Sequence, residues 1–247
     1  MSLEEFISNI NAEDLKQINE AFAKKNDDIP SFSFSQISFD DLNNFLTLKK
    51  GLTYDVFEPW FDNNISVDKE IIDFLEELIE ENQIFINSYS EENLKVNFIV
   101  PLLNKVKFKS IENEFRDFYE DKLTYKTDKF IFRGTCDFVV AKGLFRSEKP
   151  YFFIQEFKKS KENSDPEPQL LAELISAIEL NNWTTIKGAF IVGAIWNFVI
   201  LEKLGKDSYK YFVSPNFDST KIEDLKSIYQ NLLFVKEEIR SSLTHQQ

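Results

Sequence analysis

The segments GTCDFVVAK at residues 134–142 and FFIQEFKKSKE at residues 152–162 decide which fold this chain is expected to adopt. Both contain a short apolar run typical of a strand. Residues i and i+2 of a strand point to the same side, so Glu156 and Lys158 are expected on one face, with Phe157 in the opposite layer. Asp137, on the preceding strand, then brings a second carboxylate to an adjacent strand.

These side chains suggest metal-assisted chemistry. Two converging acids can hold a hard divalent cation, and a lysine beside them can steer a water molecule or neutralise a phosphate. The alternative is ordinary strand polarity with a surface ion pair. A site is favoured because Asp137 interrupts an apolar strand and Ile154 precedes Glu156 on the same face. The helix expected after the second strand begins near Gln169, which is expected to return over the site.

Hydrophobic periodicity predicts the remaining elements. Helices are expected over 3–25, 67–86, 91–106, 165–181 and 220–241, and strands over 113–126, 129–142, 150–159, 187–194, 196–204 and 208–214. Residues 26–66 are less regular and include SFSFSQISF, whose Ser/Phe alternation is compatible with a short strand. This order predicts an α/β (α+β) protein: a mixed sheet flanked by helices, preceded by an acidic, mostly helical N-terminal extension over residues 1–88.

The charge of the chain is unevenly distributed. The formal net charge is −13, and residues 1–90 hold 6 Lys and Arg against 19 Asp and Glu, whereas residues 91–247 hold 23 of each. A strongly acidic surface repels a phosphate backbone, so the charge argues against nucleic-acid binding only in the first third. That third could mask a cleft, bind a basic protein partner or keep the protein in solution. For the acidic face of the helix over 67–86, a solvated surface is the favoured interpretation.

Composition excludes several classes of site. One cysteine, Cys136, excludes an intramolecular disulfide and a multi-cysteine zinc site, and one histidine, His245, argues against a histidine triad or a histidine-bound metal. The N-terminus lacks the basic start of a signal peptide, and the apolar stretch 188–201 is too short to span a membrane as a helix. A cytoplasmic protein without membrane association is therefore expected.

Glu91 is a further candidate. Leu94 and Phe98 begin the apolar stripe of the helix expected over 91–106, and the spacing of Glu91 extends that stripe. A carboxylate on a buried stripe is costly unless it is paired or binds a metal. The alternative is a first-turn acid favoured by the helix dipole, after the cap Ser90.

Residues 90 to about 205 resemble the PD-(D/E)XK nuclease superfamily, and within it the N-terminal nuclease domain of type I restriction enzyme motor (R) subunits. The similarity is carried in chain order by SEENLKVNFIVPLL, GTCDFVVAK, FFIQEFKKSKE, PEPQLLAEL and GAIWNFVILE. The ordered set is more specific than the short E-x-K motif. The resemblance implies a restriction-endonuclease-like sheet and identifies residues 89–247 as the nuclease-like domain.

The resemblance also implies roles for individual residues. Asp137 and Glu156 match the metal-binding acids, Lys158 the catalytic lysine, Glu91 the acid of the first core helix, and Gln169 the glutamine after the E-x-K strand. The implied metal ligands are Asp137, Glu156, Glu91 and the backbone carbonyl of Phe157. The implied cofactor is Mg²⁺, with Mn²⁺ as a substitute.

The implied activity is that of a prokaryotic, Mg²⁺-dependent endonuclease, a phosphodiester hydrolase acting on nucleic acid, with DNA as the expected substrate. A restriction or defence role follows only by analogy. A homodimer is one arrangement to consider. The lysines at 105, 107 and 109 and at 159 and 161 alternate as phosphate contacts would, although lysines that protect a strand edge give the same pattern.

The chain departs from the family in two places. Cys136 stands where the family name places proline. No Gly-x-x-x-x-Gly-Lys-Ser/Thr loop is present, so the ATP-driven motor activity of restriction subunits is not expected. We expect a stand-alone nuclease module instead. The alternatives are a catalytically silent nuclease-fold interaction or regulatory protein and an acidic DNA mimic.

Overall fold

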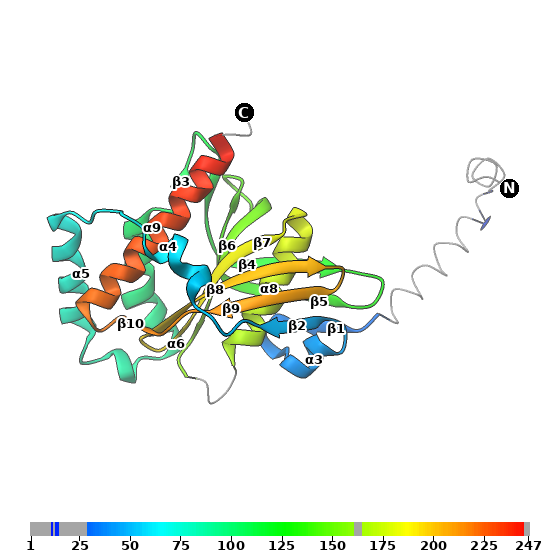
Figure 1. The fold of residues 1–247 in the computed structure, drawn as a ribbon, viewed down its shortest axis with the longest axis horizontal. Coiled ribbons are helices and arrows are strands. Elements are labelled where there is room, and N and C mark those ends of the chain that lie inside the picture. The colour runs from blue at the N-terminus through cyan, green and yellow to red at the C-terminus, as the bar shows by residue number, and fades with distance from the viewer. Residues whose placement is uncertain (1–10, 12, 15–28, 161–164, 245–247) are drawn as a thin grey trace.

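The computed structural model describes residues 11, 13–14, 29–160 and 165–244. The helix expected over residues 3–25 lies almost entirely outside them. A twisted mixed sheet runs through the centre and is packed against helices on both faces (Figure 1). The predicted mixed α/β class is therefore confirmed.

The sheet has ten strands within the described residues, and eight of them follow the order β2-β9-β8-β7-β6-β5-β4-β3. The remaining two pair at the side of this path, β1 with β5 and β10 with β8. Three pairs are parallel, namely β1 with β5, β2 with β9 and β6 with β7, and the others are antiparallel. The strands are β1 (Ser31–Ser33), β2 (Thr47–Lys50), β3 (Lys109–Ser110), β4 (Phe115–Lys126), β5 (Ile131–Lys142), β6 (Glu148–Lys158), β7 (Thr185–Val192), β8 (Ile195–Gly205), β9 (Ser208–Val213) and β10 (Phe217–Asp218).

The helices predicted over 67–86, 91–106, 165–181 and 220–241 occur close to those positions, whereas two short helices lie within residues 26–66, where no helix was predicted. The helices are α3 (Phe39–Asn43), α4 (Glu58–Phe61), α5 (Lys69–Asn82), α6 (Glu91–Leu94), α7 (Val100–Val106), α8 (Pro166–Asn181) and α9 (Ile222–Thr244). Single 3₁₀ turns are η1 (Phe34–Gln36), η2 (Asp55–Phe57) and η3 (Ile86–Ser88). A π-helical turn, η4 (Lys95–Ile99), joins α6 to α7, so the helix predicted over 91–106 is one segment with a widened turn in its middle.

Two hydrophobic cores cover the two faces of the sheet. On one face α8 packs with η1 and α3, and every residue from Pro166 to Ile178 is buried. On the other face lie α4, α5, α7 and α9. A helix buried on all sides is apolar around most of its circumference. The polar side chains of α8, Gln169 and Glu173 among them, therefore lie in an environment where each one needs a partner.

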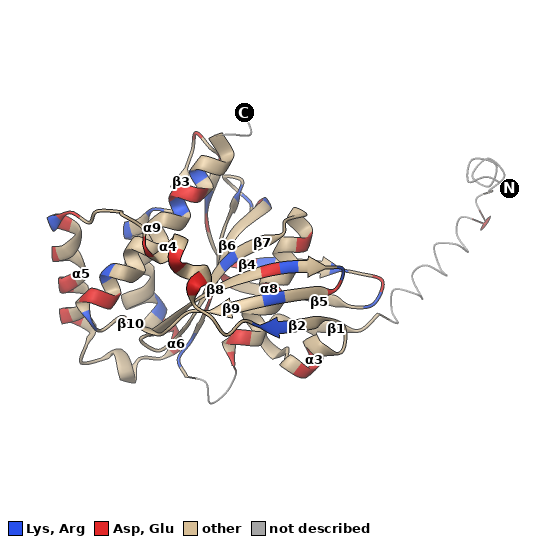
Figure 2. Ribbon diagram, in the orientation of Figure 1, with Lys and Arg blue, Asp and Glu red and all other residues tan. Residues whose placement is uncertain are grey.

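Part of the predicted N-terminal extension belongs to the sheet. β1 runs parallel to β5, and β2 runs parallel to β9. The predicted boundary after residue 88 therefore does not mark a break in the sheet. The SFSFSQISF segment does provide a short strand, and the acidic side chains of α5 are exposed, as the solvated-surface interpretation requires (Figure 2).

An opening between β5 and β6 positions the candidate site. β6 pairs with β5 only over Phe138–Lys142, and the ladder stops at the pair Phe138–Gln155. β1 pairs with Ile131–Arg133 of β5, so residues 134–137 lie between the two ladders. Phe34 packs into this interval, where a Cβ on Gly134 would come within 2.8 Å of its ring. Asp137 therefore lies where β5 and β6 separate.

Within the described residues, no helix has the length and apolar character needed to cross a membrane.

Candidate active site

Asp137 and the E-x-K strand meet at the opening between β5 and β6. The backbone N–H of Phe157 donates to Asp137 Oδ2 at 2.9 Å. This contact replaces the ladder bond that β5 would supply if the strands continued side by side. The carboxylate of Asp137 is thereby held next to the peptide group that joins Glu156 to Phe157.

Glu156 and Lys158 point to the same side of β6, as predicted. Lys158 Nζ donates to Glu156 Oε1 at 2.5 Å, and the Glu156 side chain is only 1% exposed. Phe157 belongs to the hydrophobic core of the opposite face. Oε2 of Glu156 is buried and has no hydrogen-bond partner among the protein atoms.

The backbone N–H of Phe157 faces β5 rather than β7. The N–H and C=O of one strand residue face the same neighbouring strand. Because the Phe157 N–H reaches Asp137, its carbonyl also faces the opening toward β5. The backbone of Lys158 faces the opposite edge of β6, toward β7, where its carbonyl accepts a hydrogen bond from the Gly193 N–H at 2.9 Å.

Burial and neighbouring charges shift the pKa values of Glu156 and Lys158. Burial raises the pKa of Glu156 well above its ordinary value, and the charge of Asp137 raises it further, against the lowering effect of Lys158. For Lys158, burial lowers the pKa, but the neighbouring Glu156 carboxylate reverses the direction and the pKa is raised. An added cation between Asp137 and Glu156 would relieve the repulsion between their carboxylates.

Gln169 lies in the same region but contacts a residue that was not predicted as part of the site. Its Nε2 donates to Glu173 Oε1, one turn further along α8, at 3.2 Å. Glu173 is fully buried, and burial followed by the charge of Glu156 raises its pKa well above the ordinary value. Gln169 is therefore hydrogen-bonded to a buried carboxyl group that lies within electrostatic range of Glu156.

Lys95 and Glu120 complete the polar cluster, and neither was singled out from the sequence. The ammonium of Lys95 donates to Glu120 and to Asp137 Oδ1, the latter at 3.3 Å. Lys95 is 9% exposed and begins the π turn. The spacing of Lys95 could have indicated its burial. It precedes Phe98 by three residues and Ile99 by four, so it lies on the buried side of the helix, where a charged group needs a partner.

Of the two environments considered for Glu91, the structure shows that of a first-turn acid and not that of a buried stripe. Glu91 is the first residue of α6 and is exposed, as expected for a first-turn acid after the Ser90 cap. Ser90 Oγ accepts from Asn93 N at 3.1 Å. The charge of Glu91 nevertheless contributes to the raised pKa of Lys158, so Glu91 lies within electrostatic range of the site.

Cys136 has a structural environment. The side chain is fully buried in the core between α8 and the sheet. Burial raises the pKa of its thiol well above the ordinary value, and neighbouring acids, first Glu173, add to the effect. A neutral thiol of this kind packs as a small apolar group.

The lysines considered as phosphate contacts have separate surroundings. Lys105 forms an ion pair with Glu70 of α5 at 3.0 Å, so its charge is already balanced by a protein carboxylate rather than by a phosphate. Lys107, Lys109 and Lys159 are exposed. Lys161 lies outside the described residues.

The donor set can be tested against a hard divalent cation. No group of three or more His, Cys, Asp and Glu side chains within the described parts of the chain is arranged to hold a metal ion, so Glu91 does not join Asp137 and Glu156 in such a group. The Asp137 carboxylate contacts the backbone of Phe157, and the buried Glu156 carboxylate lies within electrostatic range of it with one oxygen unpartnered. This set fits Mg²⁺, which commonly takes one or two carboxylates and fills its other positions with water and phosphate oxygens.

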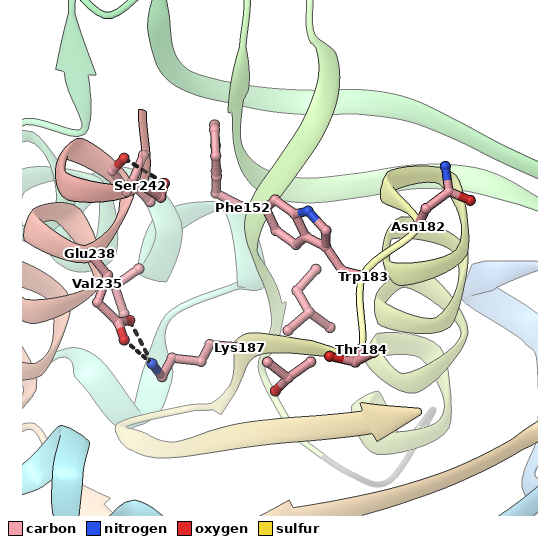
Figure 3. Close-up of a pocket in the computed structure, with 11 residues that line it drawn as sticks. Phe152, Asn182, Trp183, Thr184, Lys187, Val235, Glu238 and Ser242 are labelled. Atoms are coloured by element: carbon pink, nitrogen blue, oxygen red, sulfur yellow. Dashed lines mark hydrogen bonds and ion pairs between the residues drawn. The ribbon is translucent and has the colours of Figure 1, made fainter. Parts of the chain in front are cut away.

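A separate cavity of ≈ 500 Å³ lies on the α9 face of the sheet and contains none of the predicted site residues. Trp183 and Phe152 form one wall, and Lys187 crosses toward Glu238 of α9, which it contacts at 2.5 Å (Figure 3). No convergent set of catalytic groups lines it. The polar cluster at the β5–β6 opening is therefore the candidate active site.

Comparison with known proteins adds no family assignment: no protein-family model matches the chain, and a search of curated proteins gives no match.

Proposed function

We propose that this protein is a divalent-cation-dependent nuclease with a restriction-endonuclease-like fold, hydrolysing phosphodiester bonds in DNA. The observation that carries the proposal is the contact of Asp137 Oδ2 with the N–H of the peptide group that joins Glu156 to Phe157, which gathers both acids and the lysine at one opening of the sheet. The ordered motifs shared with PD-(D/E)XK nucleases support the same function.

Asp137, Glu156 and the Phe157 carbonyl would hold Mg²⁺ or Mn²⁺. When bound, the ion would supply a bound water of lowered pKa and neutralise charge on the phosphate. Lys158 would orient the attacking water and donate to a phosphate oxygen, because its ammonium lies beside Glu156 and is partly exposed. Gln169 and Glu173 would support Glu156 from the α8 side. Glu91 would act through its charge on Lys158.

The test is cleavage of supercoiled plasmid and of single-stranded DNA with Mg²⁺ or Mn²⁺. Lys158→Ala and Asp137→Ala are expected to lower the rate by about 10²–10³-fold, the usual cost of removing one group that stabilises transition-state charge. Lys206→Ala and Asp128→Ala are matched controls, because both residues are exposed and neither is a candidate for the site or for phosphate contact. Cleavage that persists unchanged in Lys158→Ala and Asp137→Ala would assign the activity to another site or a contaminant.

The second candidate is a silent nuclease-fold interaction protein, and one observation favours it: the Asp137 carboxylate is already paired with Lys95. Cation binding by the intact protein without DNA cleavage would support that function. Under either proposal the expected location is the cytoplasm, and the acidic first third is available to a basic protein partner.

A further inference from the structure

Three unusual local features converge on Lys95. It is a lysine with a side chain only 11% exposed, it begins the π turn between α6 and α7, and it reaches the Asp137 carboxylate. π turns inside α-helices are frequent at functional sites. An ammonium group that is withdrawn from water needs charged partners that offset the loss of hydration.

The partner on β4 adopts a backbone conformation that is rare for its residue type. Glu120 has φ 50°, in the left-handed region that non-glycine residues seldom occupy. The register pairs on either side are Tyr119–Phe138 and Asp121–Cys136, so Glu120 lies opposite Asp137 at a break in the β4–β5 ladder. This distortion brings the Glu120 carboxylate to Lys95.

The charges around Asp137 explain what such a lysine does. Asp137 Oδ2 is held by the Phe157 N–H, and Oδ1 faces Lys95. The ammonium of Lys95 also lies 5.7 Å from the centre of the Phe157 ring. Phe157 therefore contacts Asp137 through its backbone N–H and Lys95 through its ring. Lys158 is already paired with Glu156. Lys95 is thus the cation that neutralises Asp137.

We propose that Lys95 is an internal counter-cation of Asp137, which competes with a divalent ion for this carboxylate and so sets the affinity of the site for metal. The inference rests on the proposed function for the presence of a metal site. Lys95 is a positioning residue here: it holds Asp137 in place through Glu120 and withdraws from Oδ1 when an ion is bound.

The first experiment needs no metal. Urea unfolding in EDTA is measured for the wild type, Lys95→Met, Asp137→Asn and the double variant. If Lys95 and Asp137 are paired, the effects of the two substitutions on the free energy of unfolding should not add. The difference between the double variant and the sum of the single variants should correspond to at least about fivefold in the folding equilibrium constant. Additive effects would overturn the counter-cation assignment, whatever the protein's activity.

The second experiment measures Mn²⁺ affinity by calorimetry and by electron paramagnetic resonance. Lys95→Met should bind Mn²⁺ about tenfold more tightly than the wild type, because one positive charge beside the ligand is removed. Lys122→Met on β4, an exposed lysine with the same loss of charge, should change affinity less than about twofold. An unchanged or weaker affinity in Lys95→Met, or an equal gain in Lys122→Met, would overturn the competition.

A second variant covers the case in which Lys95→Met does not fold. Glu120 is 59% exposed, so Glu120→Gln is expected to fold and to leave Lys95 paired with Asp137 alone. Its Mn²⁺ affinity should fall by about threefold or more relative to Asp121→Asn, a neighbouring change of equal charge. Equal effects in the two variants would overturn the inference. Coupling in EDTA together with no Mn²⁺ binding by any variant would instead refute the metal site, and with it both the competition and the proposed function.

Discussion

Asp137 Oδ2 accepts a hydrogen bond of 2.9 Å from the backbone N–H of Phe157, across the point where β5 and β6 separate. A strand amide normally bonds to a carbonyl of the neighbouring strand. Here a carboxylate takes that place, and it is thereby fixed at the edge of the opening instead of turning into the core. The same contact limits how far Asp137 and Glu156 can move apart.

Glu156→Gln should weaken Mn²⁺ binding by about tenfold or more, because the variant keeps the shape of the side chain but loses the charge that a hard cation requires. Calorimetry with Mn²⁺ measures the effect. Glu148→Gln, an exposed change at the start of the same strand, is the control and should bind as the wild type does. Wild-type affinity in Glu156→Gln would remove this residue from the ligands.

Glu173→Gln should change the pH dependence of stability. Burial raises the pKa of Glu173 in the folded protein above its value of about 4.5 in the unfolded chain. The folded state therefore holds the proton more tightly, and its contribution to stability is present below the unfolded pKa and is lost as pH rises toward the folded pKa. Glutamine has no proton to lose, so the variant should gain stability relative to the wild type as pH rises.

Urea unfolding at several pH values between about 4 and 8 checks this expectation. Glu223→Gln, an exposed carboxylate on α9, serves as the control for the loss of one acidic group. A difference between wild type and Glu173→Gln that is constant across this range would mean that the Glu173 carboxyl does not titrate differently in the folded state.

Phe34→Ala should destabilise the protein by about 3–5 kcal/mol, the usual cost of truncating a fully buried phenylalanine. Phe34 is fully buried and packs against Gly134 in the interval between β1 and β6. The free energy of unfolding from urea titration measures it. Phe145→Ala, at a side chain 95% exposed, should stay within about 0.5 kcal/mol of the wild type. A similarly small effect at Phe34 would mean that the N-terminal segment is not integral to the sheet.

Ser90→Ala should cost about 1 kcal/mol of unfolding free energy, because the Ser90 hydroxyl accepts from the Asn93 N–H at the start of α6. Ser90→Gly should cost only a few tenths of a kcal/mol, since glycine is tolerated at this position. Equilibrium unfolding of the two variants separates the cap from general disturbance. Equal losses would contradict a capping role for the hydroxyl.

The local part of the candidate site was predictable from the sequence. Glu156 and Lys158 share a side of β6 because the side chains of a strand alternate, and this rule needs no knowledge of neighbouring elements. Asp137 was predictable as an interruption of an apolar strand. Gln169 was predictable as a member of the returning helix, but its contact with Glu173 depends on how closely α8 packs on the sheet.

Lys95 and Glu120 were harder to predict because their roles depend on backbone distortions. A π turn and a left-handed φ at a glutamate follow from no local propensity, and both are tolerated only where the surrounding structure supports them. Glu91 shows the converse. Its spacing extended the apolar stripe, but it is the first residue of its helix and is exposed there.

The order of the longer helices and strands, the mixed α/β class and the shared orientation of the E-x-K side chains were determined by the sequence alone, because hydrophobic period and strand alternation act over a few residues. Only the tertiary structure decided that β1 and β2 join the sheet, that β5 and β6 separate at Asp137, and that Lys95 forms an ion pair with this acid. Pairing between distant segments depends on how the whole chain packs, and three- or four-residue strands carry too little pattern to reveal their partners.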